Sequence, residues 1–192
     1  MDLVGPCAFR GRARWAPSSD TLLHLDSLNK LVLRDSQSLS VFRSLARPNV
    51  SCAEWSPLAE TVALATLEGS VLVWDVLEDQ ILLEKEFGLE ISDLKFSPDG
   101  KTLVVLSKLQ SFVAILALDS SRDVLFLPSP ISSSSRCVQF SSHGRYCAIA
   151  RRDLSGHKDI ISILSTLDWK LVLVRSFVCF TDEIRTSFQT LR

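Results

Sequence analysis

One sequence pattern recurs four times along this chain at intervals of about 40 residues. Its clearest copy reads Trp55-Ser56-Pro57, followed by Val73-Trp74-Asp75-Val76. Each copy begins at an aromatic anchor, and successive anchors lie 40, 41 and 44 residues apart (55−15, 96−55, 140−96): Trp15, Trp55, Phe96 and Phe140. A period near 40 that contains several short apolar runs is typical of the four-stranded blades of a β-propeller. The spacing therefore predicts an all-β chain of about four blades.

The second repeat serves as the template for one blade. Turn residues at Pro57-Leu58-Ala59-Glu60 and Glu68-Gly69-Ser70 separate short apolar runs. Strands separated in this way form an antiparallel meander. The expected strands are Cys52 to Ser56, Thr61 to Thr66, Val71 to Val76 and Gln80 to Glu86.

The third repeat follows the template closely. Its first turn reads Ser97-Pro98-Asp99-Gly100, in which proline presets φ and glycine tolerates a positive φ. We expect strands over Ile91 to Phe96, Thr102 to Ser107 and Phe112 to Leu118. Trp74 lies 19 residues after its anchor (74−55), and the same offset places Ile115 (115−96) and Arg34 (34−15) at equivalent positions. In the fourth repeat Ile163 takes this position, 23 residues after Phe140.

These repeats divide the chain into four blades and a tail. The blades occupy residues 1–177, at about 7–48, 49–88, 89–130 and 131–177, and residues 178–192 form a divergent C-terminal tail. The longer offset in the fourth repeat indicates an insertion of about four residues around 153–157, and insertions in repeat proteins lie in surface loops.

The repeats resemble those of WD-repeat proteins, with Trp74-Asp75 as the one intact Trp-Asp pair. A narrower likeness lies in the fourth repeat, in three segments: Gly144 to Asp153, Lys158 to Ile163, and Asp168-Trp169-Lys170-Leu171. Val32-Leu33-Arg34-Asp35 and Glu54-Trp55-Ser56 add to it. Over residues 12–177 the chain is similar to the WD-repeat proteins of centrosomes and spindle poles, one of which is encoded antisense to a tumour-protein gene.

This resemblance implies a fold, a role and partners. The fold would be a partial propeller, four blades of a larger ring. The role would be a non-catalytic scaffold in microtubule anchoring and spindle assembly. The partners would be a coiled-coil anchoring protein and, in some lineages, a minus-end-directed kinesin. The location would be cytoplasmic, at the centrosome or spindle pole.

Composition limits the other classes of function. With 21 basic and 22 acidic residues the formal net charge is −1, which gives no reason to expect nucleic acid or membrane binding. No apolar stretch approaches the ~20 residues of a membrane helix, and the N-terminus does not read as a secretory signal. Five scattered cysteines without a Cys-x-x-Cys pair favour buried free thiols in a reducing compartment.

No motif for catalysis or for a cofactor stands out. The three histidines, His24, His143 and His157, lack metal-ligand spacing. Neither a nucleophile elbow nor a glycine-rich phosphate loop is present. For Trp74 and Asp75 we expect structural roles, with the indole packed between blades and the carboxylate capping the next turn. We therefore expect a protein that is not an enzyme and uses no cofactor or metal.

Two basic clusters are candidate partner-binding sites. Arg10, Arg12 and Arg14 alternate with other residues, so in a strand their side chains share one face. The second cluster brackets the inserted loop: Arg151, Arg152 and Lys158. Either cluster would suit an acidic partner such as a coiled-coil helix or a tubulin tail, although ordinary solvated charge also explains both.

Three alternatives keep the same fold. A substrate receptor of a cullin-RING ubiquitin ligase often carries Trp-Asp-x-Arg, but Leu77 stands where the arginine would be; another cytosolic or nuclear adaptor is equally open. A propeller hydrolase requires histidines or carboxylates clustered at the central channel, which a structure tests directly.

Overall fold

The structure is a computed structural model. It describes residues 13–17, 20–26, 28, 30–45, 47, 49–58, 60–107, 112–119, 123–127, 138–152 and 158–178, and of residues 151, 152, 158, 159 and 178 only the backbone.

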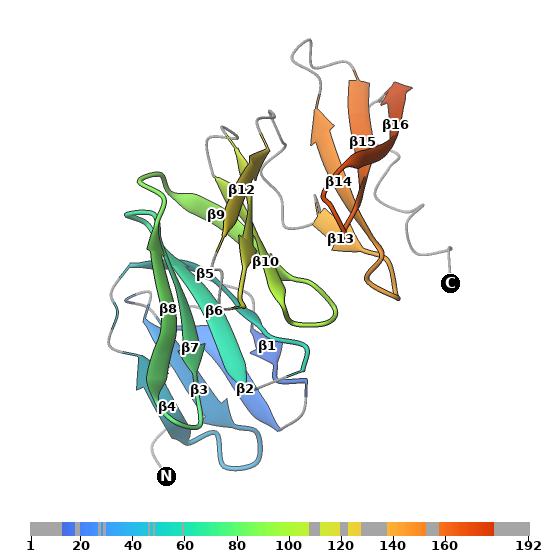
Figure 1. The fold of residues 1–192 in the computed structure, drawn as a ribbon. Coiled ribbons are helices and arrows are strands. Elements are labelled where there is room, and N and C mark those ends of the chain that lie inside the picture. The colour runs from blue at the N-terminus through green and yellow to red at the C-terminus, as the bar shows by residue number, and fades with distance from the viewer. Residues whose placement is uncertain are drawn as a thin grey trace.

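Four antiparallel sheets of four strands each follow one another along the chain (Figure 1). Within every sheet the strands pair in chain order, so each sheet is a meander, hereafter blades 1 to 4. The described residues contain no helix. Blade 1 comprises β1 (Arg14–Trp15), β2 (Thr21–Leu25), β3 (Leu31–Asp35) and β4 (Val41–Leu45); blade 2 comprises β5 (Val50–Trp55), β6 (Thr61–Thr66), β7 (Ser70–Asp75) and β8 (Gln80–Glu86); blade 3 comprises β9 (Ile91–Phe96), β10 (Thr102–Ser107), β11 (Val113–Ala117) and β12 (Val124–Leu127); blade 4 comprises β13 (Val138–Phe140), β14 (Tyr146–Arg152), β15 (Lys158–Ser165) and β16 (Leu171–Val178).

The four aromatic anchors occupy the same place in their blades. Each ends the first strand, and the residue after it donates a backbone hydrogen bond across the first turn. The donor is always one residue after the anchor and the acceptor six residues after it. These bonds are Ala16 N–H to Thr21 O (2.9 Å), Ser56 N–H to Thr61 O (2.8 Å), Ser97 N–H to Thr102 O (2.8 Å) and Ser141 N–H to Tyr146 O (2.9 Å). The predicted four-blade all-β fold is confirmed.

Two first turns use glycine as the sequence predicts. Gly100 has φ +67° and donates to Ser97 O at 2.9 Å, and Gly144 has φ +68° and donates to Ser141 O at 2.8 Å. A positive φ carries no steric penalty in glycine because the residue has no Cβ. The turn chemistry therefore fixes where the first two strands of blades 3 and 4 reverse.

The predicted equivalents of Trp74 in blades 3 and 4 are wrong by one residue. Trp74 pairs with Val62, which lies seven residues after the anchor (62−55). The residues seven after Phe96 and Phe140 pair instead with Leu116 and Leu164. The offsets are thus 20 (116−96) and 24 (164−140), so Ile115 and Ile163 face the opposite side of their sheets. The prediction for Ile115 assumed that the loop between the second and third strands has the same length in blades 2 and 3.

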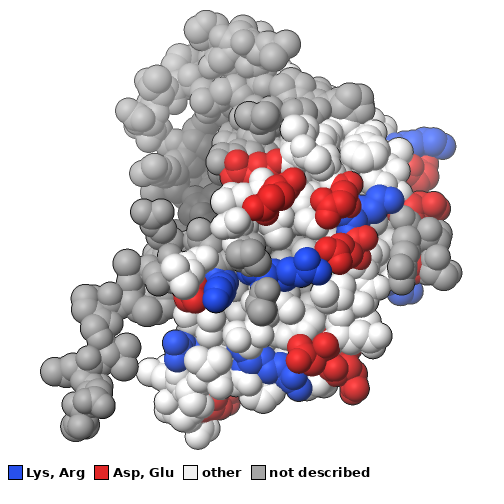
Figure 2. Space-filling view, turned by 90° about the vertical axis from the view of Figure 1, so that its left-hand side faces the viewer, with Lys and Arg blue, Asp and Glu red and all other residues white. Residues whose placement is uncertain are grey.

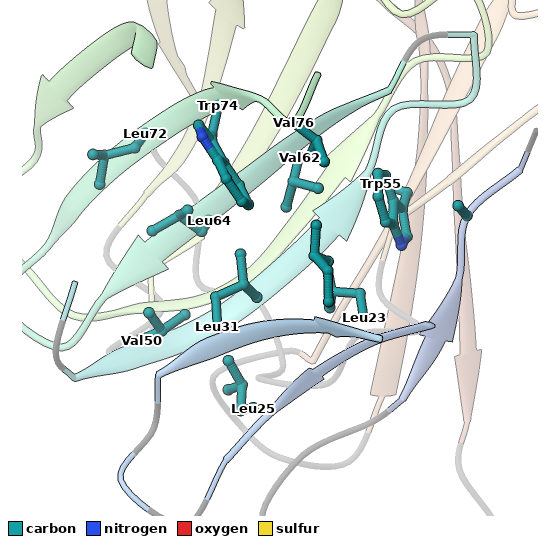
Figure 3. Packing of buried hydrophobic residues seen from close by; sticks show 12 residues of the cluster. Leu23, Leu25, Leu31, Val50, Trp55, Val62, Leu64, Leu72, Trp74 and Val76 are labelled. Atoms are coloured by element: carbon teal, nitrogen blue, oxygen red, sulfur yellow. The ribbon is translucent and has the colours of Figure 1, made fainter. Parts of the chain in front are cut away.

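The core lies between neighbouring blades in three layers. Blades 1 and 2 share one cluster of buried residues, blades 2 and 3 a second, and blades 3 and 4 a third. In the first layer, Leu23 and Leu31 of blade 1 lie opposite Leu64 and Trp74 of blade 2 (Figure 3). Residues adjacent along a strand enter different layers, because successive side chains point to opposite faces. The second and third strands of a blade are therefore apolar on both faces, as in Val62 to Ala65.

Trp74 joins the core to the neighbouring blade's outer strand. Its side chain is fully buried, and its Nε1–H donates to Asp79 Oδ1 at 3.0 Å. Asp79, at φ +55°, forms an ion pair with Arg43 of β4 at 3.3 Å, and Arg43 also donates to the Leu77 carbonyl at 3.0 Å. Asp75 has the capping role that the sequence predicts, because its Oδ1 accepts the N–H groups of Leu77 and Glu78.

We predict that Trp74→Ala destabilises the protein by about 3–5 kcal/mol, because it leaves a large void between two sheets and removes the hydrogen bond to Asp79. Chemical denaturation followed by circular dichroism measures this change. Leu77→Ala, at a side chain that is 59% exposed, is the control and should change the free energy of unfolding by less than about 0.5 kcal/mol. Equal losses in both variants would contradict the packing described for Trp74.

Candidate functional site

The residues immediately before the four anchors form a row along the first strands. The first strands of blades 1, 2 and 3 lie beside one another, which makes them the inner strands of the arrangement. In blades 1, 2 and 3 the position before the anchor points toward the next blade, because it pairs with a residue in the layer that the two blades share. We call the row the inner charged row; it consists of Arg14, Glu54, Lys95 and Gln139.

Glu54 links three blades electrostatically. Its carboxylate is buried and forms an ion pair with Arg14 of blade 1. Its Oε1 also accepts a hydrogen bond from Lys95 Nζ of blade 3 at 2.8 Å. A buried carboxylate is costly unless it is paired and hydrogen-bonded. Two cations from the neighbouring blades meet this requirement, so Glu54 fixes the order cation, anion, cation around the inner strands.

The surroundings of the row shift the pKa of Lys95 and the pKa of the nearby Cys52 thiol. Burial and the nearby Arg14 charge lower the pKa of Lys95, and the buried carboxylate of Asp93 partly opposes that shift. Burial, and then the negative charge of Asp93, raise the pKa of the Cys52 thiol to about 12. Cys147, in blade 4, has its pKa raised by burial to about 12 as well. Both thiols stay protonated at neutral pH.

A cavity of about 300 Å³ opens where the inner strands of blades 2, 3 and 4 reach their first turns. Apolar walls and a few polar groups make up its lining, and the three anchors that contribute to it are buried. Gln139 and Ser142 stand exposed at its mouth. The lining residues are Glu54, Trp55, Pro57, Lys95, Phe96, Pro98, Gln139, Phe140, Ser141 and Ser142. Such a mixture suits one side chain or a short turn of another protein.

The structure describes part of each predicted basic cluster. The Arg14 guanidinium is engaged by Glu54, while Arg10 and Arg12 lie outside the described residues. Arg151 and Arg152 end β14 and Lys158 begins β15, with Arg152 opposite Asp159 in the register, but their side chains are not described. Sequence reasoning missed Glu54, Lys95 and Gln139 as site residues. Their signal was present in the repeats, since each lies one residue before an anchor.

Charges of both signs alternate over an outer face of the molecule (Figure 2). Arg47 of blade 1 forms an ion pair with Glu84 of blade 2 at 3.2 Å, and Arg43 forms one with Asp79 at 3.3 Å. Exposed pairs of this kind contribute little to stability. On this face no single sign of charge dominates.

Nothing in the described part of the chain builds a metal site or a membrane span. The described residues contain no group of three or more His, Cys, Asp or Glu residues that could hold a metal ion. They contain no helix that is long and apolar enough to cross a membrane. The inner charged row itself brings one carboxylate between two cations, and its four residues include no histidine.

We predict that Glu54→Gln destabilises the protein by about 1–3 kcal/mol, because it leaves Arg14 and Lys95 without their shared counter-charge. Adding Lys95→Gln to Glu54→Gln should recover part of the loss, and a double-mutant cycle measured by denaturation gives the coupling energy. The control is the exposed pair Lys170–Asp168, at 3.2 Å, where Asp168→Asn should have almost no effect. Additive losses for Glu54 and Lys95 would contradict the coupling.

Cys52 and Cys147 should resist thiol reagents in the native protein at pH 8. With pKa values raised to about 12, only about one thiol in ten thousand is the reactive thiolate at that pH. Peptide mapping after a short maleimide pulse, with and without denaturant, measures labelling at each cysteine. Rapid native labelling of either residue would contradict its environment.

Comparisons with known proteins define the fold. No family model matches the sequence, and no curated protein sequence matches it. Kuenenia stuttgartiensis hydrazine synthase has a similar structure, with a TM-score of 0.69 and 18% identity over 93% of this chain and 53% of that chain. The β-propeller domain of Cps50 (Swd1) from Myceliophteria thermophila has a TM-score of 0.70 and 12% identity, over 98% of this chain and 72% of that one. This chain thus spans about half of the hydrazine synthase chain. Its four sheets are blades of a β-propeller.

Proposed function

We propose that this chain is a non-catalytic protein-interaction scaffold, and that its cavity at the first turns of blades 2 to 4 receives part of a partner protein. The observation that carries the proposal is the cavity itself, since three blades contribute to one site through equivalent positions of the repeat. Propeller blades are held rigidly by their shared cores, so loops and inner strands can present a fixed binding surface.

The chemistry of the cavity favours an apolar side chain next to a polar group. Pro57 and Pro98 supply rigid apolar walls, and Trp55, Phe96 and Phe140 supply the aromatic edges. Hot spots of protein interfaces have this character, with a desolvated apolar pocket and a polar rim. The exposed Gln139 amide can donate a hydrogen bond to a partner's backbone carbonyl and accept one from a partner's backbone N–H. The carboxylate of Glu54 is already paired with Arg14 and Lys95.

The cellular role follows from the motif resemblance. We propose that the scaffold acts in microtubule anchoring and spindle assembly at the centrosome or spindle pole, with a coiled-coil anchoring protein as partner and a minus-end-directed kinesin in some lineages. Part of the resembling sequence, Asp168-Trp169-Lys170-Leu171, has a structural part in blade 4. Trp169 packs edge to face on the anchor Phe140, with ring centroids 6.4 Å apart, so this motif supports the blade that borders the cavity.

Proximity labelling in dividing cells tests both parts of the proposal. The unaltered chain should label centrosomal or spindle-pole neighbours. Ser142→Trp, which fills the mouth of the cavity, should reduce labelling of the direct partner about tenfold or more, because losing one well-packed pocket contact costs at least about 1.4 kcal/mol. Leu58→Trp is the matched control: it lies in the corresponding turn of blade 2, is 71% exposed and does not line the cavity.

The outcomes separate the two claims. Absence of centrosomal neighbours from the unaltered chain would argue against the cellular placement. Equal labelling by the Ser142→Trp and Leu58→Trp variants would rule out the cavity as the binding site, while leaving a scaffold role to another surface.

A further inference from the structure

The inner charged row changes character at blade 4. Arg14, Glu54 and Lys95 alternate in sign, and ion pairs join Glu54 to the cation on either side of it. Lys95 meets a carboxylate on its blade 2 side, but the next member of the row, Gln139, carries an exposed neutral amide. The alternation of charge therefore ends at Lys95, in the wall of the cavity that Lys95 and Gln139 both line.

Lys95 keeps hydrogen-bonding capacity on the cavity side. An ammonium group has three N–H donors. Among the described residues, Lys95 Nζ donates one hydrogen bond, to Glu54 Oε1 at 2.8 Å. The side chain is 34% exposed and forms part of the cavity wall. Donors on this ammonium thus remain available to a group that enters the cavity.

The carboxylates around Lys95 do not fully balance the positive charges. Asp93 lies two residues earlier on β9, is buried, and favours the charged form of Lys95, whereas burial and the charge of Arg14 disfavour it. Burial and Arg14 together have the larger influence, so the pKa of Lys95 is lowered. A further carboxylate in contact with Nζ would stabilise the ammonium, because a nearby opposite charge favours the charged form.

We propose that the cavity binds an acidic side chain of the partner protein, with its carboxylate accepting hydrogen bonds from Lys95 Nζ and from the Gln139 amide. This inference rests on the proposed function, since it names the group that enters the cavity. Hydrogen bonds between an ammonium and a carboxylate are shorter and stronger than those between neutral groups. The order of the row would become cation, anion, cation, anion, with the last charge supplied by the partner.

The cavity also fits the apolar neighbours of such an acidic residue. Phe96, Pro98 and Phe140 contribute apolar surface to the same wall as Lys95. Gly144 of the next turn lies against Pro98, where a Cβ placed on the glycine would be 3.6 Å from Pro98 Cδ and Cγ. The apolar wall thus continues from blade 3 to blade 4. It suits a partner segment in which aliphatic residues flank an acidic one.

A basic side chain is disfavoured at the same place. Glu54 is the one carboxylate among the described residues that line the cavity, and Arg14 and Lys95 already pair with it. An incoming ammonium or guanidinium would meet the charge of Lys95 and would find no unpaired carboxylate in the wall. The charge of the cavity wall therefore selects against cations.

Two capped peptides that differ only in charge test this inference: acetyl-Leu-Glu-Leu-amide and acetyl-Leu-Gln-Leu-amide. Titration into the isotopically labelled chain, followed by NMR through the backbone N–H signals of Gln139 and Ser142, gives a dissociation constant for each. The Glu peptide should bind at least about tenfold more tightly, because a charge-assisted hydrogen bond contributes more than its neutral counterpart. The Gln peptide with a free C-terminal carboxylate distinguishes a chain terminus from an acidic side chain, and should bind no more tightly than its amide.

Two variants remove the preference for the Glu peptide by independent routes. Lys95→Met deletes the ammonium, so the two peptides should bind equally. Gln139→Glu places a carboxylate of the chain itself in the cavity wall with Lys95, so the Glu peptide should lose its advantage; this position is exposed, which keeps the test valid if Lys95→Met does not fold. Lys101→Met and Gln80→Glu are the matched controls. Both side chains are exposed, neither lines the cavity, and both variants should keep the preference.

Four results would each overturn the inference: equal binding of the two capped peptides by the unaltered chain, binding of neither, a Glu preference that survives Lys95→Met or Gln139→Glu, or a free-terminus peptide that binds as tightly as the Glu peptide. None of them bears on the partner labelling that Ser142→Trp should reduce, so the cavity would remain the proposed binding site for a group of other chemistry. Conversely, partner labelling that is unchanged by Ser142→Trp would defeat the proposed function even if the Glu peptide binds.

Discussion

Every sheet in this structure has two apolar faces, and each face needs another sheet to cover it. A meander of four short strands with Val62 to Ala65 at its centre cannot shield both sides by itself. Radial stacking solves this problem because neighbouring blades cover each other's apolar faces. The burial of the anchors Trp55, Phe96 and Phe140 and the apolar third strands follow from this packing. The shared layers, more than the strands themselves, therefore define the fold.

The repeat made many strand boundaries predictable. The loops that vary in length between repeats made the register of some strands unpredictable. The strands Thr61–Thr66, Gln80–Glu86 and Ile91–Phe96 match the sequence-based boundaries, because turn residues with fixed backbone requirements border them. The register of the third strand in blades 3 and 4 was not predictable. It depends on the length of the preceding loop, and a one-residue difference exchanges the two faces of a strand. Leu116, not Ile115, consequently faces blade 2.

The candidate site was harder to predict than the fold. Its residues are ordinary in type, and only their position one residue before each anchor brings them together. Sequence periodicity gave that position but not its chemistry, because the pairing of Glu54 with Arg14 and Lys95 depends on distances across blades. The structure pairs the Arg14 guanidinium with the buried carboxylate of Glu54, and the predicted role of Arg14 in partner binding stays a prediction. The charged side chains of the inner strands pair with one another across neighbouring blades.

Glu54 also explains why the blades cannot be exchanged freely despite their common plan. An apolar layer is non-directional and accepts many neighbours of suitable volume. A buried carboxylate that needs a cation from each side accepts few, because a neighbour without one would leave the charge unpaired at a cost of several kcal/mol. Blades 1, 2 and 3 are thereby fixed in order by charge as well as by shape. Gln139 in blade 4 is neutral, so this position of the row carries no charge that needs a partner of opposite sign.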